Sequence, residues 1–300
     1  MKVDLHIHSI YSDSSRSPEE IVALAKKRNV GLISICDHAT IGAYSTLPEI
    51  CRSNGMQYVL GVELEVLWKG EGLHMLAYNF DPNDPKMKTF MDEQYKAVEC
   101  EYIVYNMMQD HPQMSLEEYR HFTYSKEKGG WKYLYYAVAK GAAKTYEEAN
   151  ETIYSRYGTP NHLSHFGECD MADFYKMVNR AGGVPVLAHP GYLYERDPGK
   201  FVPMLREMRA CGLEGIECYY PSHTKDVIDT CVFFCKNNDM RITGGCDCHG
   251  EFDKSEGFTV GALEISLPML DLTGTTLGGA GSICLAGPIC CSICLRSRSI

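Results

Sequence analysis

Short apolar runs that end in polar residues recur along the first part of the chain. They cover residues 3–8, 31–38 and 57–63, and the stretches between them have the apolar spacing of amphipathic helices. The polar ends of these runs are separated by about the length of one strand–helix unit. The pattern predicts an α/β fold, either a parallel barrel or a doubly wound sheet.

The alternation of strands and helices is interrupted once. After an apolar run at residues 73–80, the sequence shows helical periodicity and turns without a strand pattern, and apolar runs ending in polar residues resume near residue 184. The last thirty residues are rich in Gly, Ser, Thr and Cys. We therefore expect an α/β domain at 1–80 and 168–270, a helical insert at 81–167, and a disordered low-complexity tail at 271–300.

The composition of the chain excludes some classes of binding partner. The chain has 300 residues and a formal net charge of −10, so it lacks the basic surface that long nucleic acid requires. It has no run of about 20 apolar residues for a membrane span and no secretory pattern at its start. We expect a cytoplasmic protein away from membranes, with its 14 cysteines mostly reduced and buried. The oligomeric state is left open.

The first apolar run carries the first candidate ligands. Alternate side chains of a strand share a face, so His6 and His8 point together while Leu5 and Ile7 point into apolar packing. Asp13 follows five residues after His8, in the loop after the strand. This stretch therefore supplies three candidate metal ligands.

Further imidazoles and carboxylates follow the later strands. Barrel enzymes build their active sites at the carboxyl ends of several strands, so such residues are expected to converge on one face. His74 differs because it opens its strand. The set predicts a polynuclear metal site and consists of His6, His8, Asp13, Asp37, His38, Glu63, His74, His189, Asp247 and His249.

These motifs together resemble the PHP family, named for polymerase and histidinol phosphatase. The resemblance covers most of residues 1–80 and 170–265 and implies a distorted (β/α)7 TIM-like barrel with a trinuclear metal centre and phosphoesterase activity. The motifs that carry it are His6-x-His8 with Asp13, Cys36-Asp37-His38, Gly61-Val62-Glu63, His74, Ala188-His189-Pro190 and Cys246-Asp247-Cys248-His249.

The same resemblance implies which residues hold each ion. It places His6, His8, Glu63 and Asp247 on the first metal, Glu63, His74 and His189 on the second, and Asp13, His38 and His249 on the third. Ligands of this oxygen and nitrogen type leave manganese, iron and zinc all open. We expect two to three divalent ions.

The charge of such a centre favours a phosphate substrate. Three divalent ions and three carboxylates leave an excess of about +3, because ligating imidazoles are neutral. Metal ions also lower the pKa of water, so we expect a hydroxide to attack phosphorus in line. Glu63 is expected to bridge two ions, and Asp37, beside a ligand, to face away or to orient an imidazole from outside.

Three residues outside the metal set are candidates for contact with the substrate. His223 follows a strand near the expected mouth of the site and could be a general acid or a phosphate donor; the alternative is a loop histidine that caps a helix. In the insert, Trp131 could cover a base, although its aromatic residues also suit an ordinary core. Lys132 could contact a phosphate, in place of the arginine expected in relatives.

The sequence thus predicts a metal-dependent phosphoesterase for small phosphorylated substrates, above all nucleotides such as a nucleoside 3',5'-bisphosphate or an oligonucleotide end. A histidinol-phosphate phosphatase is the alternative enzyme. An amidohydrolase-type carbon–nitrogen hydrolase would also use His6-x-His8, but it would not explain the third ligand set. A non-catalytic metal-binding module is the alternative of another class.

Overall fold

The opening apolar run forms β1 (Lys2–Ile7), the first strand of a five-stranded sheet. β2 (Val30–Ile35) pairs with β1 in parallel, and β3 (Gln57–Tyr58) pairs with β2 in the same way, as the strand–helix spacing predicts. β9 (Thr276–Gly279) and β10 (Ile283–Cys284) complete the sheet as antiparallel strands. The computed structural model describes residues 1–93, 97–158, 170–251, 257–279 and 283–284.

A second five-stranded sheet carries the other strands in the order β4-β5-β6-β7-β8. Its first two strands form a hairpin and β6 pairs antiparallel with β5, whereas β6, β7 and β8 run parallel. The strands are β4 (Gly61–Trp68), β5 (Glu71–Tyr78), β6 (Val184–Leu187), β7 (Gly215–Tyr219) and β8 (Arg241–Gly244).

The α/β class is confirmed, but the prediction of a barrel is wrong in one respect: the two sheets, as described, are not closed into a barrel. The β4–β5 turn explains part of the difference. Lys69 and Gly70 both have positive φ, at 52° and 83°, which is the geometry of a two-residue hairpin turn. β5 therefore returns antiparallel beside β4, where a barrel of parallel strands would need a helix between them.

The two sheets still meet along their edges. Single β-bridges join His38 to Glu63 and Ile7 to Cys248. Gly245 makes the second approach possible, because a Cβ at this position would lie 2.3 Å from the backbone nitrogen of His6. Both junctions bring candidate ligands from the two sheets together.

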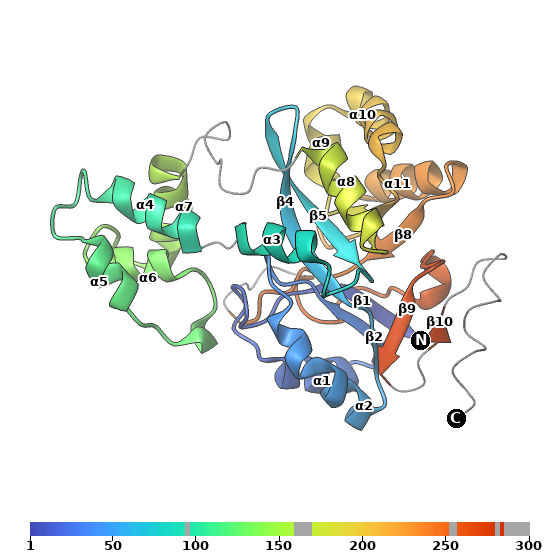
Figure 1. The fold of residues 1–300 in the computed structure, drawn as a ribbon, viewed down its shortest axis with the longest axis horizontal. Helices are drawn as coiled ribbons and strands as arrows, with labels where there is room; N and C mark the ends of the chain where they lie inside the picture. Colours follow the sequence, from blue (N-terminus) through green and yellow to red (C-terminus); the bar gives the residue numbers. More distant parts are fainter. Residues whose placement is uncertain (94–96, 159–169, 252–256, 280–282, 285–300) are drawn as a thin grey trace.

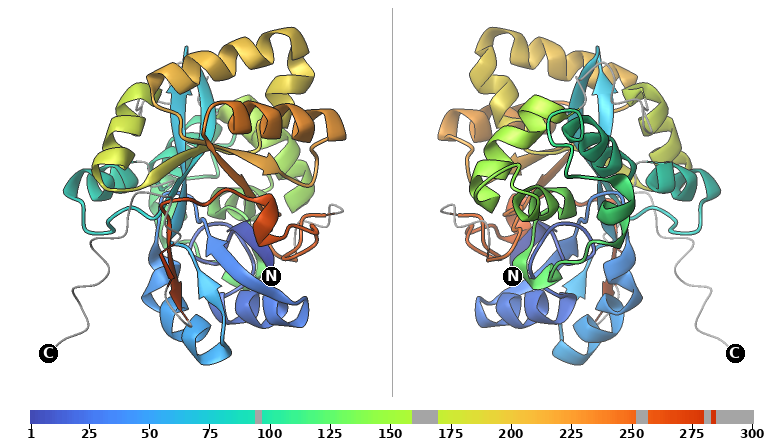
Figure 2. Two further views of the ribbon diagram at one scale, coloured as in Figure 1. Left: turned by 90° about the vertical axis from the view of Figure 1, so that its right-hand side faces the viewer. Right: turned by 90° about the vertical axis from the view of Figure 1, so that its left-hand side faces the viewer.

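Helices cover the outer faces of the sheets (Figures 1 and 2). Apolar side chains from both sheets, including Val3, Leu32, Leu76 and Val186, form one buried cluster. On the first sheet lie α1 (Pro18–Lys27), η1 (Gly42–Ser45) and α2 (Leu47–Asn54), and with the second are α8 (Met171–Arg180), α9 (Gly191–Arg196), α10 (Pro198–Cys211) and α11 (Lys225–Asn237).

Side-chain caps fix where several helices begin. Ser17 and Glu20 form a capping box at the start of α1, with Pro18 at its first position. Thr224 accepts a hydrogen bond from the backbone of Val227 at the start of α11. These starts agree with the signals in the sequence.

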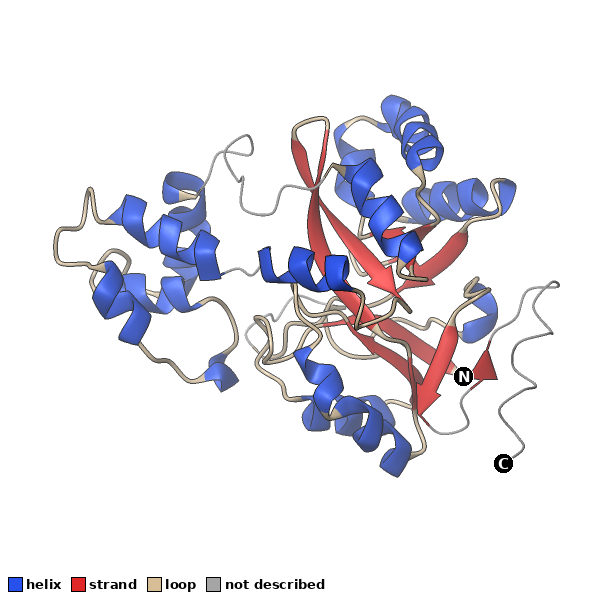
Figure 3. Cartoon of the chain, in the orientation of Figure 1, coloured by secondary structure: helices blue, strands red, loops and turns tan. Residues whose placement is uncertain are grey.

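Most of the helices between β5 and α8 extend to one side of the sheets, whereas the first of them lies beside the second sheet and packs in its core (Figures 1 and 3). Four of them share a hydrophobic core that includes Ile103, Val104, Leu134 and Ile153. That residues 81–167 form an insert domain with a role in specificity stays a prediction. The helices are α3 (Pro85–Glu93), α4 (Ala97–Met107), α5 (Leu116–His121), η2 (Lys126–Lys128), α6 (Lys132–Ala139) and α7 (Tyr146–Tyr157).

The end of the chain differs in part from the predicted disordered tail. Residues 276–279 form β9, which adds to the first sheet beside β3, and η3 (Leu267–Met269) lies just before it. Residues 280–282 and 285–300 lie outside the described residues, so the prediction for them stays untested. The nine cysteines that the structure describes before residue 280 are free thiols. Across the described residues, no helix combines the length and apolar character that a bilayer crossing needs.

Candidate metal centre

His6, near the end of β1, and His8, directly after it, point together into the space where the sheets meet. The Nε2 atoms of His6 and His8 lie 3.2 Å apart, and both side chains are fully buried. Leu5 and Ile7, which alternate with them, pack in hydrophobic clusters. The alternation predicted from the sequence is confirmed.

Glu63, on β4, lies among five imidazoles. Its Oε1 is 3.0 Å from Nδ1 of His74 and 3.1 Å from Nε2 of His189. Its Oε2 is 3.1 Å from Nε2 of His8 and 3.4 Å from both Nε2 of His6 and Nδ1 of His38. The two oxygens thus face different imidazoles, which is the geometry that a bridging carboxylate needs.

Two more carboxylates complete the surroundings of His6 and His8. Oδ1 of Asp247, which follows β8, lies 3.0 Å from Nε2 of His8, and its Oδ2 accepts a hydrogen bond from Tyr220 at 2.9 Å. Oδ2 of Asp13 lies 3.5 Å from Nε2 of His249 and 3.8 Å from Nε2 of His38. Oδ1 of Asp13 also lies 3.5 Å from Nδ1 of His8, so Asp13 and Asp247 face different ring nitrogens of His8.

Nine side chains fall into three groups whose ligand atoms lie within 4.8 Å of one another. Glu63 belongs to the first and second groups, and His8 to the first and third. The resemblance to the PHP family had implied His8 in the first group alone. The first group is His6, His8, Glu63 and Asp247; the second is Glu63, His74 and His189; the third is His8, Asp13, His38 and His249.

The groups fit divalent metal ions in their chemistry. Oδ1 of Asp13 and Oδ1 of Asp247 are buried without a hydrogen-bond partner, although buried polar atoms are normally satisfied. His6 Nδ1 faces Glu217 Oε1 at 3.1 Å, and His249 Nδ1 faces the Asp247 carbonyl oxygen at 2.8 Å. Such outer partners leave the Nε2 lone pairs directed inward, as in metal-ligating histidines. The clusters fit a site for several metal ions.

The buried carboxylates and imidazoles of the centre shift one another's pKa values. Burial raises the pKa of Glu63, but His74, His6 and His38 outweigh it and hold that pKa well below its ordinary value. Burial lowers the pKa of His6, but its neighbouring carboxylates, Glu217 first, hold it well above its ordinary value. The pKa of His38, lowered by burial, is about 3. Ion binding would therefore displace protons from His6.

Two candidate ligands have unusual backbone conformations. His189 has a φ of 28° and Asp247 a φ of 51°, in the left-handed region that residues other than glycine seldom adopt. Such conformations cost free energy and cluster at functional sites. Both residues directly follow buried segments that lead out of β6 and β8.

Asp37 does not contact an imidazole directly. Its Oδ1 accepts hydrogen bonds from the Ser9 nitrogen at 2.7 Å and the Ser12 hydroxyl at 2.6 Å, and its Oδ2 accepts one from the Ser9 hydroxyl. Ser12 Oγ lies 3.4 Å from Nδ1 of His8. Asp37 therefore holds the loop after β1 and reaches His8 through Ser12.

His223 differs from the expected general acid. Its Nδ1 lies 3.0 Å from the Cys218 carbonyl oxygen, to which it donates, and its Nε2 accepts a hydrogen bond from the Gly191 nitrogen at 3.0 Å. Burial lowers its pKa, which favours this neutral form. In this arrangement both ring nitrogens bind backbone groups, so His223 joins β7 to α9 and has no proton directed at a substrate.

The two candidates in the insert have different positions. The Trp131 ring centre lies 5.9 Å from that of His38, at the third group. Gly130 also donates a backbone hydrogen bond to the Asp13 carbonyl oxygen at 2.6 Å. Lys132, in contrast, donates from Nζ to the Arg120 carbonyl oxygen at 3.0 Å and covers the Tyr119 ring. Lys132 thus contacts the insert itself in this structure, and its contact with a phosphate stays a prediction.

Glu217 is a residue of the centre that the sequence analysis missed. It is fully buried on β7, where its Oε1 faces Nδ1 of His6 and its Oε2 accepts a hydrogen bond from the His189 nitrogen at 2.8 Å. It therefore positions two candidate ligands from different sheets. The signal was available, because Glu217 is an acid near the carboxyl end of an apolar strand run.

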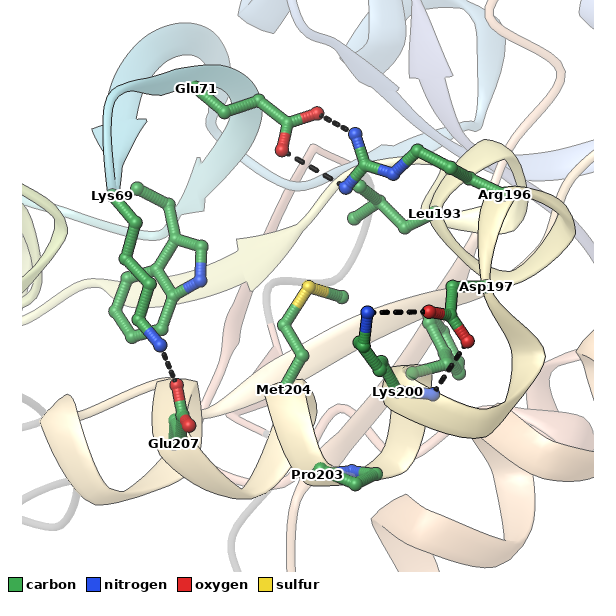
Figure 4. Close-up of a pocket in the computed structure, with 11 residues that line it drawn as sticks. Lys69, Glu71, Leu193, Arg196, Asp197, Lys200, Pro203, Met204 and Glu207 are labelled. Carbon is green, nitrogen blue, oxygen red and sulfur yellow. Dashed lines mark hydrogen bonds and ion pairs between the residues drawn. The ribbon is translucent and has the colours of Figure 1, made fainter.

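A separate pocket of about 470 Å³ lies between the β4–β5 turn, α9 and α10 (Figure 4). Arg196 pairs with Glu71, Lys200 with Asp197, and Lys69 with Glu207. Each of these three cations thus has a carboxylate partner. The pocket offers a phosphate no uncompensated charge from them and lies apart from the three ligand groups.

Comparisons with known proteins agree with this geometry. A 5'-3' exoribonuclease of Haemophilus influenzae is 27% identical over 253 residues, which cover 83% of this chain and 90% of the relative. A 3',5'-nucleoside bisphosphate phosphatase of Chromobacterium violaceum is 24% identical over 282 residues, or 86% and 91% of the two chains.

The fold is also known from a solved structure and a family model. A Bifidobacterium adolescentis protein described as a metal-dependent phosphoesterase has a TM-score of 0.71 and 22% identity, over 89% of this chain and 93% of the other. The model of the PHP domain matches residues 4–181, more than half of the chain. Sequence, fold and ligand groups together place this chain in the PHP family of metal-dependent phosphoesterases.

Proposed function

We propose that this protein hydrolyses phosphate esters of small nucleotides at the three ligand groups. The observation that carries the proposal is the sharing of Glu63 and His8 between groups, which packs the sites for several cations into one contiguous centre. A compact set of cations suits a phosphate, because its charge is spread over several oxygens. The two named relatives act on nucleotides or RNA, which supports this substrate class.

Bound divalent ions would supply Lewis-acid stabilisation of the phosphate and a lowered pKa for an attacking water. The chain's own residues hold the geometry. Glu63 fixes the spacing between the first and second groups, since its two oxygens face different imidazoles. Asp247 is held by Tyr220, and His6 by Glu217. The phosphorus atom of the substrate would lie beside the three ligand groups.

The identity of the nucleotide is a finer proposal. A nucleoside 3',5'-bisphosphate and the end of an oligonucleotide both present a phosphate ester beside a base. Trp131 stands at the third group, where it could meet that base. We propose manganese, iron or zinc as the resident ions, because the ligands are imidazole nitrogens and carboxylate oxygens.

The test is a phosphate-ester screen on purified protein, with metal analysis of the same sample. The panel holds adenosine 3',5'-bisphosphate, a short oligoribonucleotide with a 5'-phosphate, histidinol phosphate and an aryl phosphate. We expect two to three ions per chain, turnover that a chelator abolishes, and the highest kcat/KM on one of the two nucleotide substrates.

Two results would contradict the proposal. Preference for histidinol phosphate would assign the substrate to the alternative enzyme. Fewer than one ion per chain after purification with manganese, together with no turnover of any ester, would refute a metal-dependent hydrolase.

A further inference from the structure

A pocket of about 750 Å³ opens beside the third ligand group. Asp13 and His249 line its inner end, and Asp13 has a buried Oδ1 without a hydrogen-bond partner. The opposite wall comes from the insert. The pocket therefore leads from the proposed reaction centre to the insert, and its volume is ample for a nucleoside.

Three aromatic side chains form the wall on the insert side. Trp131, Tyr135 and Tyr146 all line the pocket and are half-buried. The rings of Tyr135 and Tyr146 lie 4.7 Å apart, and the Trp131 ring lies 5.9 Å from that of His38. Half-buried rings of this kind present flat apolar surfaces on which a base can stack.

The charges around the same pocket are mostly negative. Glu127, Glu147 and Glu151 line it and are exposed. A fourth acid, Glu251, pairs with Arg16. Among the described residues that line the pocket, the cation is Lys128, and its Nζ lies 5.8 Å from the centre of the Tyr135 ring. Carboxylates accept hydrogen bonds from amino groups and repel phosphates.

We propose that this pocket holds an uncharged, amino-bearing nucleobase and repels a second phosphate, which in a bisphosphorylated substrate must lie outside the pocket. The inference rests on the proposed function, because it names the group at the non-reacting end of the same substrate. Adenine, guanine and cytosine have both a flat face for the aromatic wall and an amino group for the carboxylates. Lys132 is not among the residues that line this pocket, and its Nζ donates to the Arg120 carbonyl oxygen.

The first experiment measures binding without catalysis. The chain has two tryptophans, so Trp68→Phe leaves Trp131 as the sole tryptophan, and Trp68 lies in the other pocket. We expect adenosine to change the Trp131 fluorescence in a saturable way and ribose at the same concentrations to leave it unchanged. No saturable change with adenosine, or an equal change with ribose, would overturn the proposal.

The second experiment tests the charge. The double variant Glu147→Gln, Glu151→Gln is compared with the control Glu19→Gln, Glu117→Gln, in which both positions are exposed in the first turns of α1 and α5. The readout is the kcat/KM for adenosine 3',5'-bisphosphate divided by that for adenosine 3'-monophosphate. We expect this ratio to rise about 3- to 10-fold in the pocket variant at low salt and less at high salt.

An unchanged or lowered ratio in the pocket variant would overturn the charge argument. If the wild-type protein hydrolyses none of these esters, the proposed function fails, while the fluorescence titration still decides whether the pocket binds a base. In that case the same double variant is titrated with adenosine 3',5'-bisphosphate, and equal affinity in variant and wild type counts against the inference.

Discussion

The metal centre and the pocket beside it are built in opposite ways. The side chains of His6, His8 and Glu63 are buried, and the ligands come from strands or strand ends of both sheets. Most of the pocket's wall comes from one insert, with half-buried rings and exposed glutamates. Ligands that come from many parts of the fold are expected to set the chemistry of the site. The pocket's wall comes mostly from one segment, so substitutions there can change substrate preference with little loss of stability. Changes in the centre should therefore affect every substrate, and changes in the pocket only some.

The largest effect is expected from Glu63→Gln. An amide cannot offer two anionic oxygens to His74 and His8, so the spacing of the first two groups is lost. We expect kcat to fall by at least about 10³-fold on all substrates, with a lower metal content. Glu19→Gln is the exposed control. A near-normal kcat on any single ester would contradict the conclusion that changes in the centre affect every substrate.

Glu217→Gln comes next. The amide can accept only one of the two hydrogen bonds that Glu217 now accepts from His6 and His189, so both ligands lose orientation. We expect metal affinity to fall about 10- to 100-fold, with activity restored by excess manganese. Glu214→Gln, three residues away and half-buried, is the matched control. Loss of activity that added metal leaves unchanged would contradict a positioning role.

Asp37→Asn should have a smaller effect. Asp37 acts on His8 through Ser12 and accepts three hydrogen bonds, of which an amide can keep only part. We expect a loss of about 10-fold in kcat/KM that is equal for nucleotide and aryl phosphates. Asp226→Asn, on the exposed start of α11, serves for comparison. A loss confined to nucleotides would place Asp37 with the pocket.

The smallest effect is expected from Lys132→Ala. Its Nζ binds the Arg120 carbonyl oxygen and lies over Tyr119, away from the ligand groups. We expect kcat/KM to change less than about threefold on mono- and bisphosphorylated nucleotides, because an exposed polar contact is worth little. Lys86→Ala is the surface control. A selective loss on the bisphosphate would restore Lys132 as a phosphate contact and weaken the charge argument for the pocket.

The candidate ligands could be predicted because their signals are local, whereas their division into three groups followed from the resemblance to the PHP family. The alternation of side chains along residues 3–8 fixes that His6 and His8 share a face. Glu63 was expected at the end of a strand at 57–63, but it lies near the start of β4. The structure brings these residues together as expected. Glu217 follows the same rule and was overlooked, although nothing in its sequence context distinguishes it from the others.

The features that were not predicted depend on tertiary structure. The direction of β5 is set by positive φ at Lys69 and Gly70, and the sequence of that turn permits other conformations. The position of Lys132 depends on how α5 packs against α6, and that of His223 on the backbone of α9. Neither contact leaves a periodic signal. β9 pairs with β3 across more than two hundred residues, which no local pattern reveals.

The hydrogen bond from Gly130 to the Asp13 carbonyl oxygen couples the position of the insert to the geometry of the third ligand group. Asp13 lies in the loop that Asp37 holds through Ser9 and Ser12, so the position of the insert and the shape of this loop are set together. Coupling of this kind is reciprocal. If the insert in its observed position strengthens ion binding at the third group, a bound ion stabilises that position of the insert by the same free energy. The affinity of the third group for an ion would thus measure whether the pocket beside it is assembled.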